Sequence, residues 1–375
     1  MGNRPLVLIA TATAALAAAV ATAEPSAGER EGGPRQGAPL AGKELPRTAD
    51  GHPDLSGVYD VATLTPLERP EMFGDNLYLS AEQAQQFEAQ AAAFRAATST
   101  RSDPNREAPP AGGDGSPGAA GNVGGYNTFW IDNGDDTFAI EGKHRTSIIH
   151  DPPNGRLPQL TPRGMANRAI LFRAFRENTG QAWWLEEQME VGPYDDPEMR
   201  PLGERCLLGF GSTSGPPMLP VLYNNVKRIV QTPDHVMILN EMVHDARIIR
   251  IGGEHPPADV RRWMGDSIGH WEGDTLVVDT TNFRDKSGLY LYGATEDLHV
   301  VERFRRVDEN TLHYSFTVED PSAWAAPWSG EYPWPVADTS VYEYACHEAN
   351  YALGNIMRGA RLLEADYEQA IAGGE

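Results

Sequence analysis

A run of short apolar segments separated by turns occupies residues 226–320 and most constrains the fold. VKRIVQ (226–231), DTLVVDTTNF (274–283) and TLHYSFTVED (311–320) have strand-like lengths, and most linkers are as short as Gly252-Gly253. Strands joined by such turns indicate an antiparallel meander. Because a long meander must curl or close to protect its edges, we predict a mainly β fold. It would be an antiparallel meander closing into a lipocalin-like barrel or a strongly curved sheet, with a few peripheral helices.

Further elements are predicted on the N-terminal side of this run. Residues 54–61 and 145–151 have strand patterns, and Asn133-Gly134 lies between TFWID and TFAIEG as a hairpin signal. SAEQ (80–83) fits a capping box, so we expect a helix from there to about residue 97. The spacing of apolar residues predicts a second helix at 160–178.

Residues 1–23 are predicted to be a cleavable signal peptide. Arg4 gives a positive start, residues 5–20 are almost wholly apolar, and Ala21-Thr22-Ala23 is a small-x-small cleavage site. The alternative, a membrane anchor, is disfavoured by this cleavage site. We expect the mature protein to be periplasmic or secreted.

The remaining chain is predicted to form one domain with flexible additions. Composition predicts a disordered N-terminal segment at 24–45 and a polar C-terminal tail at 361–375. Between them we expect a single β-barrel-like domain at 46–360, with a mobile Pro/Gly/Ser-rich loop at 98–122.

Charge and hydropathy limit the classes of partner. The formal net charge is −22, which disfavours nucleic acid and anionic membrane surfaces. No later apolar run reaches the roughly 20 residues that a membrane-spanning helix needs. GFGSTSG (209–215) lacks the order of a phosphate loop, and no metal-site spacing of histidines is present. We therefore expect no cofactor, no bound metal, no nucleic acid and no stable membrane insertion.

The two cysteines, Cys206 and Cys346, lie in the part predicted to be exported. An oxidising compartment favours a disulfide between them. The alternative is a pair of separate buried thiols.

The segment Arg262–Arg306 is unusually rich in ionisable side chains for a β region. In LHVVERFRR (298–306), alternation puts Glu302 on the apolar, inward face, with His299 and Arg303 on the other. A carboxylate among apolar side chains needs a partner or a raised pKa. Glu302 is therefore a candidate for proton transfer, and the alternative is a buried structural Glu–Arg pair.

Two other segments contribute candidates. In EMVHDAR (241–247), alternation puts Glu241 and Arg247 on one face and His244 on the other. Asp266 lies between Gly265 and Gly269, which could bend the strand and aim its side chain inward. These groups could do general acid/base work inside a barrel, or form an exposed polar face.

The expected site combines these acid/base groups with polar and aromatic neighbours. The predicted catalytic residues are Glu241, His244, Asp266, His299 and Glu302. The predicted substrate-binding residues are Arg247, Trp263, Trp271, Asp279, Asn282, Tyr290 and Arg303. Aromatic rings near these polar groups favour a small hydrophobic ligand.

Several motifs resemble those of a family of exported bacterial proteins. They include IVQTPD (229–234), EMVHDARII (241–249), WMGDSIGHWEGDTLVVDTTNF (263–283) and YACHEANY (344–351). The resemblance covers about residues 50–360 and brings no catalytic residues with it. More loosely, the meander is similar to lipocalin-like bacterial enzymes such as carotenoid hydratases, an analogy at the level of the fold.

The sequence leaves two functions open. The first is a periplasmic β-barrel enzyme that binds a small, largely apolar terpenoid or aromatic molecule. Its acid/base residues would catalyse hydration, elimination, isomerisation or cyclisation. The second is a non-catalytic periplasmic carrier for a hydrophobic ligand. Convergent ionisable groups favour the enzyme, whereas a mainly apolar lumen favours the carrier.

Overall fold

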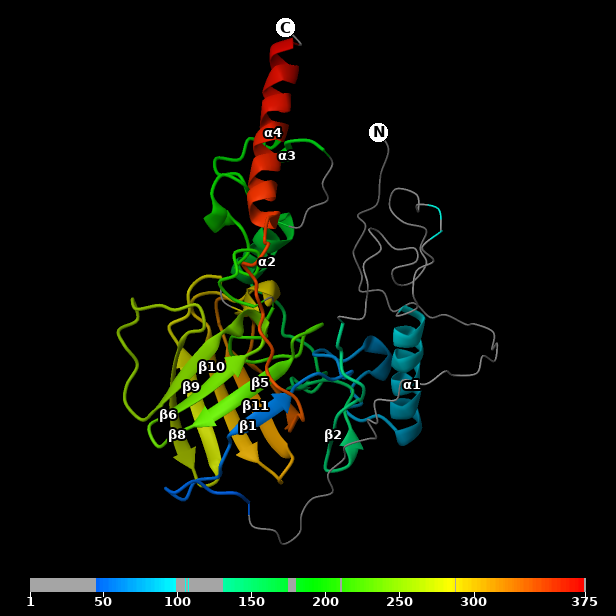
Figure 1. Ribbon diagram of the computed structural model, residues 1–375, viewed down its shortest axis with the longest axis vertical. Coiled ribbons are helices and arrows are strands. Elements are labelled where there is room, and N and C mark those ends of the chain that lie inside the picture. Colours follow the sequence, from blue (N-terminus) through cyan, green and yellow to red (C-terminus); the bar gives the residue numbers. More distant parts are fainter. Residues whose placement is uncertain are drawn as a thin grey trace. The chain divides into compact units, whose positions relative to one another are not determined.

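A computed structural model describes residues 45–98, 105, 107, 131–174, 180–209, 211–286 and 288–373 (Figure 1). Residues 1–36, which include the predicted signal peptide, lie outside the described residues. So do nearly all of the segment 24–45 and most of the loop 98–122.

Ten strands form one curled sheet in the part of the chain that the structure describes. Their order across the sheet is β1-β5-β6-β7-β8-β9-β10-β11-β12-β4. The strands are β1 (Gly57–Asp60), β4 (Ile149–Asp151), β5 (Val226–Gln231), β6 (His235–Asn240), β7 (Ala246–Ile251), β8 (Asp266–Glu272), β9 (Thr275–Thr281), β10 (His299–Arg306), β11 (Thr311–Glu319) and β12 (Trp328–Pro335). The predicted mainly β, strongly curved fold is confirmed.

The two ends of the meander meet. Tyr59 in β1 forms an antiparallel bridge with Val336, just beyond β12. The amide of Ala337 donates a hydrogen bond to the carbonyl oxygen of Val58 at 2.8 Å. The curl therefore brings the first strand against the residues that follow the last long one, which leaves less of either edge unpaired.

One pair of strands departs from the predicted antiparallel meander. β7 and β8 run parallel, with Ile249 opposite Ser267 and Ile251 opposite Gly269. Gly252-Gly253 is not a tight turn between them, because residues 252–265 form a long connection that returns the chain to the other end of the sheet. Parallel neighbours require such a crossover.

The hairpin predicted at Asn133-Gly134 is wrong for the described residues. The turn lies instead at Glu141-Gly142, between β2 (Ala139–Ile140) and β3 (Lys143–His144). Both turn residues have positive φ, 52° and 75°, as a type I′ hairpin requires. At Gly134 a side chain would lie 2.7 Å from the backbone of Thr63, so that glycine permits a close approach of two backbone segments.

The described part of the chain also contains four α-helices and four 3-10 turns. They are α1 (Ala81–Thr98), α2 (Pro162–Ala174), α3 (Trp183–Glu186) and α4 (Ala352–Gly373), with 3-10 turns η1 (Glu71–Phe73), η5 (Pro197–Met199), η6 (Met242–His244) and η7 (Gly288–Tyr292). The predicted capping box of α1 is confirmed, since Ser80 and Gln83 exchange backbone-to-side-chain hydrogen bonds of 2.9 and 3.2 Å. No described helix has the length and apolar character needed to cross a membrane.

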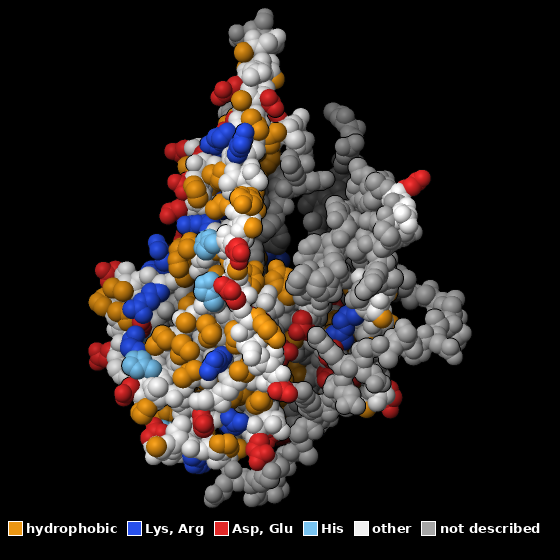
Figure 2. All heavy atoms as spheres, viewed as in Figure 1, with side chains coloured by type: hydrophobic (Ala, Val, Ile, Leu, Met, Phe, Trp, Pro, Cys, Tyr) orange, Lys and Arg blue, Asp and Glu red, His pale blue; other side chains and the backbone are white. Residues whose placement is uncertain are grey.

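A small second core holds the C-terminal helix. Ala360 of α4 packs with Trp183 and Trp184 of α3, and the Trp184 indole donates a hydrogen bond to Glu364 at 2.8 Å. Apolar and charged side chains share the exposed surface of α4 (Figure 2). The predicted disulfide is confirmed as well: Cys206 and Cys346 are bonded, with their Cα atoms 5.8 Å apart.

The inside of the curl is filled by protein. Aromatic side chains such as Tyr314, Trp328 and Trp334 are fully buried there. Residues 212–219 are also buried from end to end, although they form no helix or strand. The Met218 amide donates a hydrogen bond to the Tyr314 hydroxyl at 2.9 Å, and the Tyr332 hydroxyl donates one to the Met218 carbonyl at 2.6 Å. This segment therefore plugs the interior that a lipocalin would use for a ligand.

Candidate functional site

The inward-facing charges form a closed pair. Arg247 of β7 and Glu302 of β10 are 2% and 0% exposed and form a bidentate ion pair. Arg247 also donates to the hydroxyls of Ser267 and Thr280 at 3.0 and 2.9 Å. The Tyr314 hydroxyl donates to Glu302 at 2.8 Å. Each charge is neutralised and hydrogen-bonded, an arrangement typical of a structural pair.

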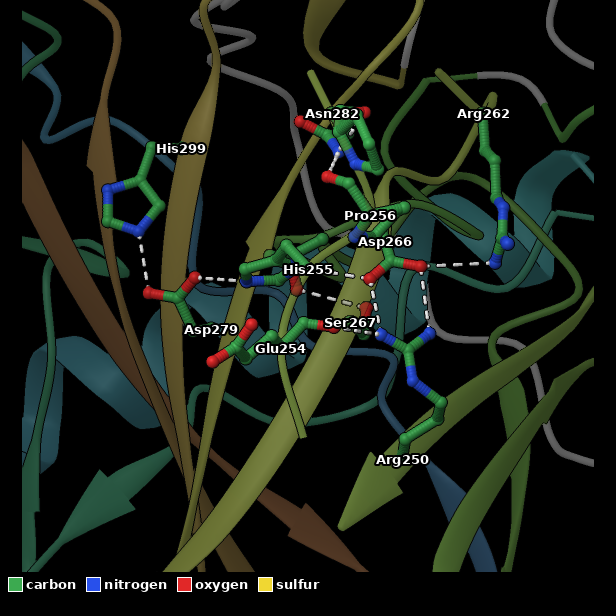
Figure 3. A network of polar contacts seen from close by, with 12 residues as sticks. Arg250, Glu254, His255, Pro256, Arg262, Asp266, Ser267, Asp279, Asn282 and His299 are labelled. Atoms are coloured by element: carbon green, nitrogen blue, oxygen red, sulfur yellow. Dashed lines mark hydrogen bonds and ion pairs between the residues drawn. The ribbon is translucent and has the colours of Figure 1, made fainter. Parts of the chain in front are cut away.

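A second set of ionisable side chains lies on the outer face of the same strands (Figure 3). Asp266 of β8, Asp279 of β9 and His299 of β10 share this face because Ser267 and Thr280, next to them in sequence, point inward to Arg247. The expectation that Asp266 is aimed inward is therefore wrong. Gly265, with φ 69°, comes directly before β8, and Ser267 takes the inward position next to Arg247.

His255 links two strands of this outer face. It belongs to the long connection between β7 and β8, which Asn282 fixes by donating a hydrogen bond to the Pro256 carbonyl at 3.0 Å. Its Nδ1 lies 3.0 Å from Asp266 Oδ1, and its Nε2 lies 2.8 Å from Asp279 Oδ1. Ionised carboxylates only accept hydrogen bonds, so this geometry suits an imidazole that donates from both nitrogens.

His299 extends the chain of contacts toward the next strand. Its Nε2 lies 2.7 Å from Asp279 Oδ2, and its Nδ1 lies 3.4 Å from Glu319 of β11. The hydrogen bond to Asp279 raises the pKa of His299 and lowers that of Asp279. His299 and Asp279 are 35% and 36% exposed, so a small molecule can reach both.

Two arginines hold the buried end of this chain of contacts. Arg250 donates to both oxygens of Asp266 at 2.8 and 2.9 Å, and Arg262 lies 3.1 Å from the same carboxylate. The hydrogen bond from Arg250 lowers the pKa of Asp266, so this buried acid stays ionised. We define the outer-face network as Arg250, His255, Arg262, Asp266, Asp279, His299 and Glu319. It alternates carboxylates and imidazoles across four strands.

Glu241 and His244 lie outside this network, at the turn between β6 and β7. The Tyr342 amide donates to Glu241 at 3.3 Å, and His244 Nδ1 lies 3.2 Å from the Tyr344 carbonyl. Alternation could not place these side chains, because the strand ends at Asn240 and η6 reverses the chain.

Four other predicted substrate-binding residues have separate surroundings. Trp263 stacks under Arg284, 4.5 Å from ring centroid to guanidinium, and Trp271 stacks on His52 at 4.4 Å. Arg303 pairs with Glu272 at 2.7 Å. Tyr290 lies in η7, where burial raises its pKa to about 12. The structure does not bring these four together.

The sequence predicted three members of the network and missed the central imidazole. Asp266, Asp279 and His299 lie in one chain of polar contacts, and Asn282 holds the Pro256 carbonyl next to His255. His255 was overlooked because it lies in a loop, GGEHPP, where no alternation assigns a face. A histidine beside two prolines in a long crossover was the available signal, since loops held by rigid strands often carry functional groups.

Within the described residues, no group of three or more His, Cys, Asp or Glu side chains has the geometry to hold a metal ion.

No protein-family model matches this chain. No curated protein matches it either.

Proposed function

We propose that the protein is an acid/base enzyme and that the outer-face network is its active site. The observation that carries the proposal is the Asp279 carboxylate, which lies between two imidazoles at 2.7 and 2.8 Å. A carboxylate that orients an imidazole and supports its charge is a recurrent device for general acid/base catalysis. The reactions in reach are hydration, elimination, isomerisation and cyclisation, which a general acid and base can catalyse without an oxidant or reductant.

His299 is the group assigned to exchange a proton with the substrate. It is the more exposed of the two imidazoles, and its raised pKa keeps it protonated closer to neutral pH than an ordinary histidine. Asp279 orients the ring, and His255 holds Asp279 in place from the other side. This division of roles makes His299 the general acid in the resting protein.

The surroundings of Asp279 favour a largely apolar substrate. Ile268 and Val301 lie directly opposite Asp279 on the two neighbouring strands, and both are half-buried. Aliphatic surface beside a polar group is typical of sites for small organic molecules. A carrier function would use the interior of the curl, which residues 212–219 already fill.

The disulfide fits an extracytoplasmic location. Such bonds persist in oxidising compartments, and Cys206 and Cys346 are bonded here. Together with the predicted signal peptide, this supports a periplasmic or secreted enzyme.

A deuterium-exchange screen tests the proposed function across several classes of compound. Small terpenoid and aromatic alkenes, alcohols and ketones are incubated with the protein in D₂O, and incorporation is followed by mass spectrometry. We expect turnover with at least one class of compound. Asp279→Asn should reduce that rate by about 10²–10⁴-fold, because the amide cannot support the charged imidazole.

The matched control is Glu272→Gln. Glu272, on the outer face of β8, also pairs with an arginine and a histidine, Arg303 of β10 and His270 of β8. It lies outside the network. The variant should keep full turnover. Equal activity of Asp279→Asn and wild type would refute the assignment of the site, and the absence of exchange with every compound class would refute the enzyme.

A further inference from the structure

The outer face of strands β5, β6 and β7 is apolar although it lies at the surface. Each strand has six residues, so alternation gives three outward positions per strand and nine in all. None of the nine is buried. Figure 2 shows hydrophobic side chains gathered over β5. Six of the nine outward residues are apolar: Val226, Val230, Met237, Leu239, Ala246 and Ile248.

An unbroken apolar row crosses the middle of this face. Val230 lies directly opposite Met237, and Met237 lies directly opposite Ile248. Val230 and Ile248 are 37% and 49% exposed. Contiguous exposed apolar side chains of this kind mark interaction surfaces more often than scattered ones do.

Another strand of the same sheet shows the usual pattern of a solvated face. The outward positions of β11 are all polar, namely Thr311, His313, Ser315, Thr317 and Glu319. A sheet with one face in water alternates in this way, whereas strands covered on both faces have near-continuous apolar runs. The runs VMIL (236–239) and RIIRI (247–251) are of the second kind. The composition of β5–β7 is therefore that of a face that another layer covers.

This face also carries no acidic side chain. Its three remaining outward residues are Arg228, His235 and Arg250, in a chain with 53 Asp and Glu residues and a formal net charge of −22. Two copies of so acidic a protein repel each other wherever their carboxylates come close. A face without carboxylates is where two copies can approach with the least repulsion.

We infer that two copies of this chain pack their β5–β7 faces against each other and form a dimer. Two sheets stacked face to face lie about 10 Å apart, with the side chains of the two faces interdigitated. The same surface on both copies then makes the contact, as a two-fold axis requires. From strand rise and spacing, the face measures about 20 Å by 14 Å. This is below the roughly 800 Å² per partner of a stable complex, so the dimer is weak and reversible.

Analytical ultracentrifugation of the full chain tests the inference. As the protein concentration rises from about 10 µM to 1 mM, the mass should rise from that of one chain toward that of two. Raising sodium chloride from about 0.1 M to 1 M shortens the screening length from about 10 Å to 3 Å. Because this weakens the repulsion between two acidic copies, the dimer should become stronger. A chain that stays monomeric throughout, or a dimer that salt dissociates, would overturn the inference.

Two variants locate the interface. Ile248→Glu and Val230→Glu each place a carboxylate on both facing surfaces, so each should weaken the dimer by about tenfold or more. The matched control is Ile170→Glu in α2, where the isoleucine is 52% exposed and the change in charge is the same; it should dimerise as wild type does. Circular dichroism checks that each variant folds, and Val230→Glu carries the test if Ile248→Glu does not fold. Dimers of unchanged strength in the folded β5–β7 variants would contradict the assignment.

A lipid surface is the competing occupant of this face. Sedimentation with phosphatidylcholine vesicles distinguishes the two, since wild type should stay in the supernatant. Binding to the vesicles by a protein that remains monomeric, lost in Val230→Glu, would assign the face to lipid and overturn the dimer. His299→Gln should dimerise as wild type does, so the result is independent of the acid/base proposal.

Discussion

Glu302 lies at the centre of the buried charge pair, and its removal tests whether that pair is structural. Glu302→Gln keeps the volume but leaves the Arg247 guanidinium buried without a counter-charge. We expect the free energy of unfolding to fall by about 3–5 kcal/mol, as for other broken buried pairs. Urea denaturation followed by tryptophan fluorescence measures the change.

The control replaces both partners. Arg247→Met with Glu302→Leu removes both charges and retains apolar volume, so it should recover most of the stability lost in the single variant. A single variant as stable as wild type would show that the pair contributes nothing. Loss of proton-exchange activity in Glu302→Gln at unchanged stability would move the active site to the interior.

The pair of Asp279 and His299 should make stability depend on pH. The folded pKa of His299 is raised above its ordinary 6.5, so its contribution is complete below that pH and is lost as the pH rises through the folded value. The pKa of Asp279 is lowered below 3.8, so its contribution is lost as the pH falls through that lower value. Both contributions to the free energy of unfolding are therefore complete between pH 3.8 and pH 6.5, the ordinary pKa values of the two groups.

The prediction is a difference between two proteins. The gap in unfolding free energy between wild type and His299→Gln should be widest between about pH 4 and 6.5 and should narrow toward pH 9. Denaturant unfolding across this range measures it, and a gap that grows with pH would contradict the assigned direction.

At the scale of the elements, the crossover that connects β7 to β8 ends at a glycine, Gly265, which has little space around it. Gly265 has φ 69°, and a Cβ there would lie 2.8 Å from the Thr281 carbonyl oxygen and 2.9 Å from the Phe283 ring. Gly265→Ala should cost about 1–2 kcal/mol from the left-handed backbone and about 1–3 kcal/mol from overpacking. Thermal unfolding measures the loss.

Gly252 provides the matched control. It has φ 77° and open space around its Cβ position, so Gly252→Ala should show only the backbone cost of about 1–2 kcal/mol. Equal losses at both glycines would mean that the crossover is not packed tightly against β9. The packing of this crossover bears on the proposed function because the crossover carries His255, which contacts Asp266 and Asp279.

The strands of the meander could be predicted from alternation, but β12 could not. Its sequence, WSGEYPWP, contains two prolines, which argue against an interior strand. The structure accommodates them because β12 pairs along its length with β11, while β4 pairs only at Ser329 and Gly330. Pro333 and Pro335 therefore lie beyond the part of β12 that pairs with β4, so their missing N–H groups cost no hydrogen bond to that strand.

For the molecule as a whole, the disulfide ties the C-terminal segment to the middle of the chain. It spans 140 residues of sequence, so replacing Cys206 and Cys346 together by serine should cost about 2–5 kcal/mol. Hydrogen exchange should show that amides of α4 lose protection while those of β9 and β10 keep it. The wild-type protein treated with a reductant serves as the control, and unchanged protection in α4 would contradict the prediction.

Patterns of neighbouring residues in the sequence were enough to predict the strand faces, the start of a helix and the disulfide. Alternation with a period of two placed Glu302 inside and His299 outside, a capping box set the start of α1, and the cysteine pair predicted the disulfide. These features depend on a residue and its near neighbours in the chain, or on the redox compartment, and none depends on the order of strands in the sheet.

Which charges meet depends on the packing of the folded chain. The parallel placement of β8 beside β7 sets Arg250 against Asp266, and the crossover between them carries His255 over the outer face to Asp279. The same curl folds residues 212–219 into the interior, where the sequence predicted space for a ligand. Partners so far apart in the chain are selected by the packing of the whole sheet, which no local pattern encodes.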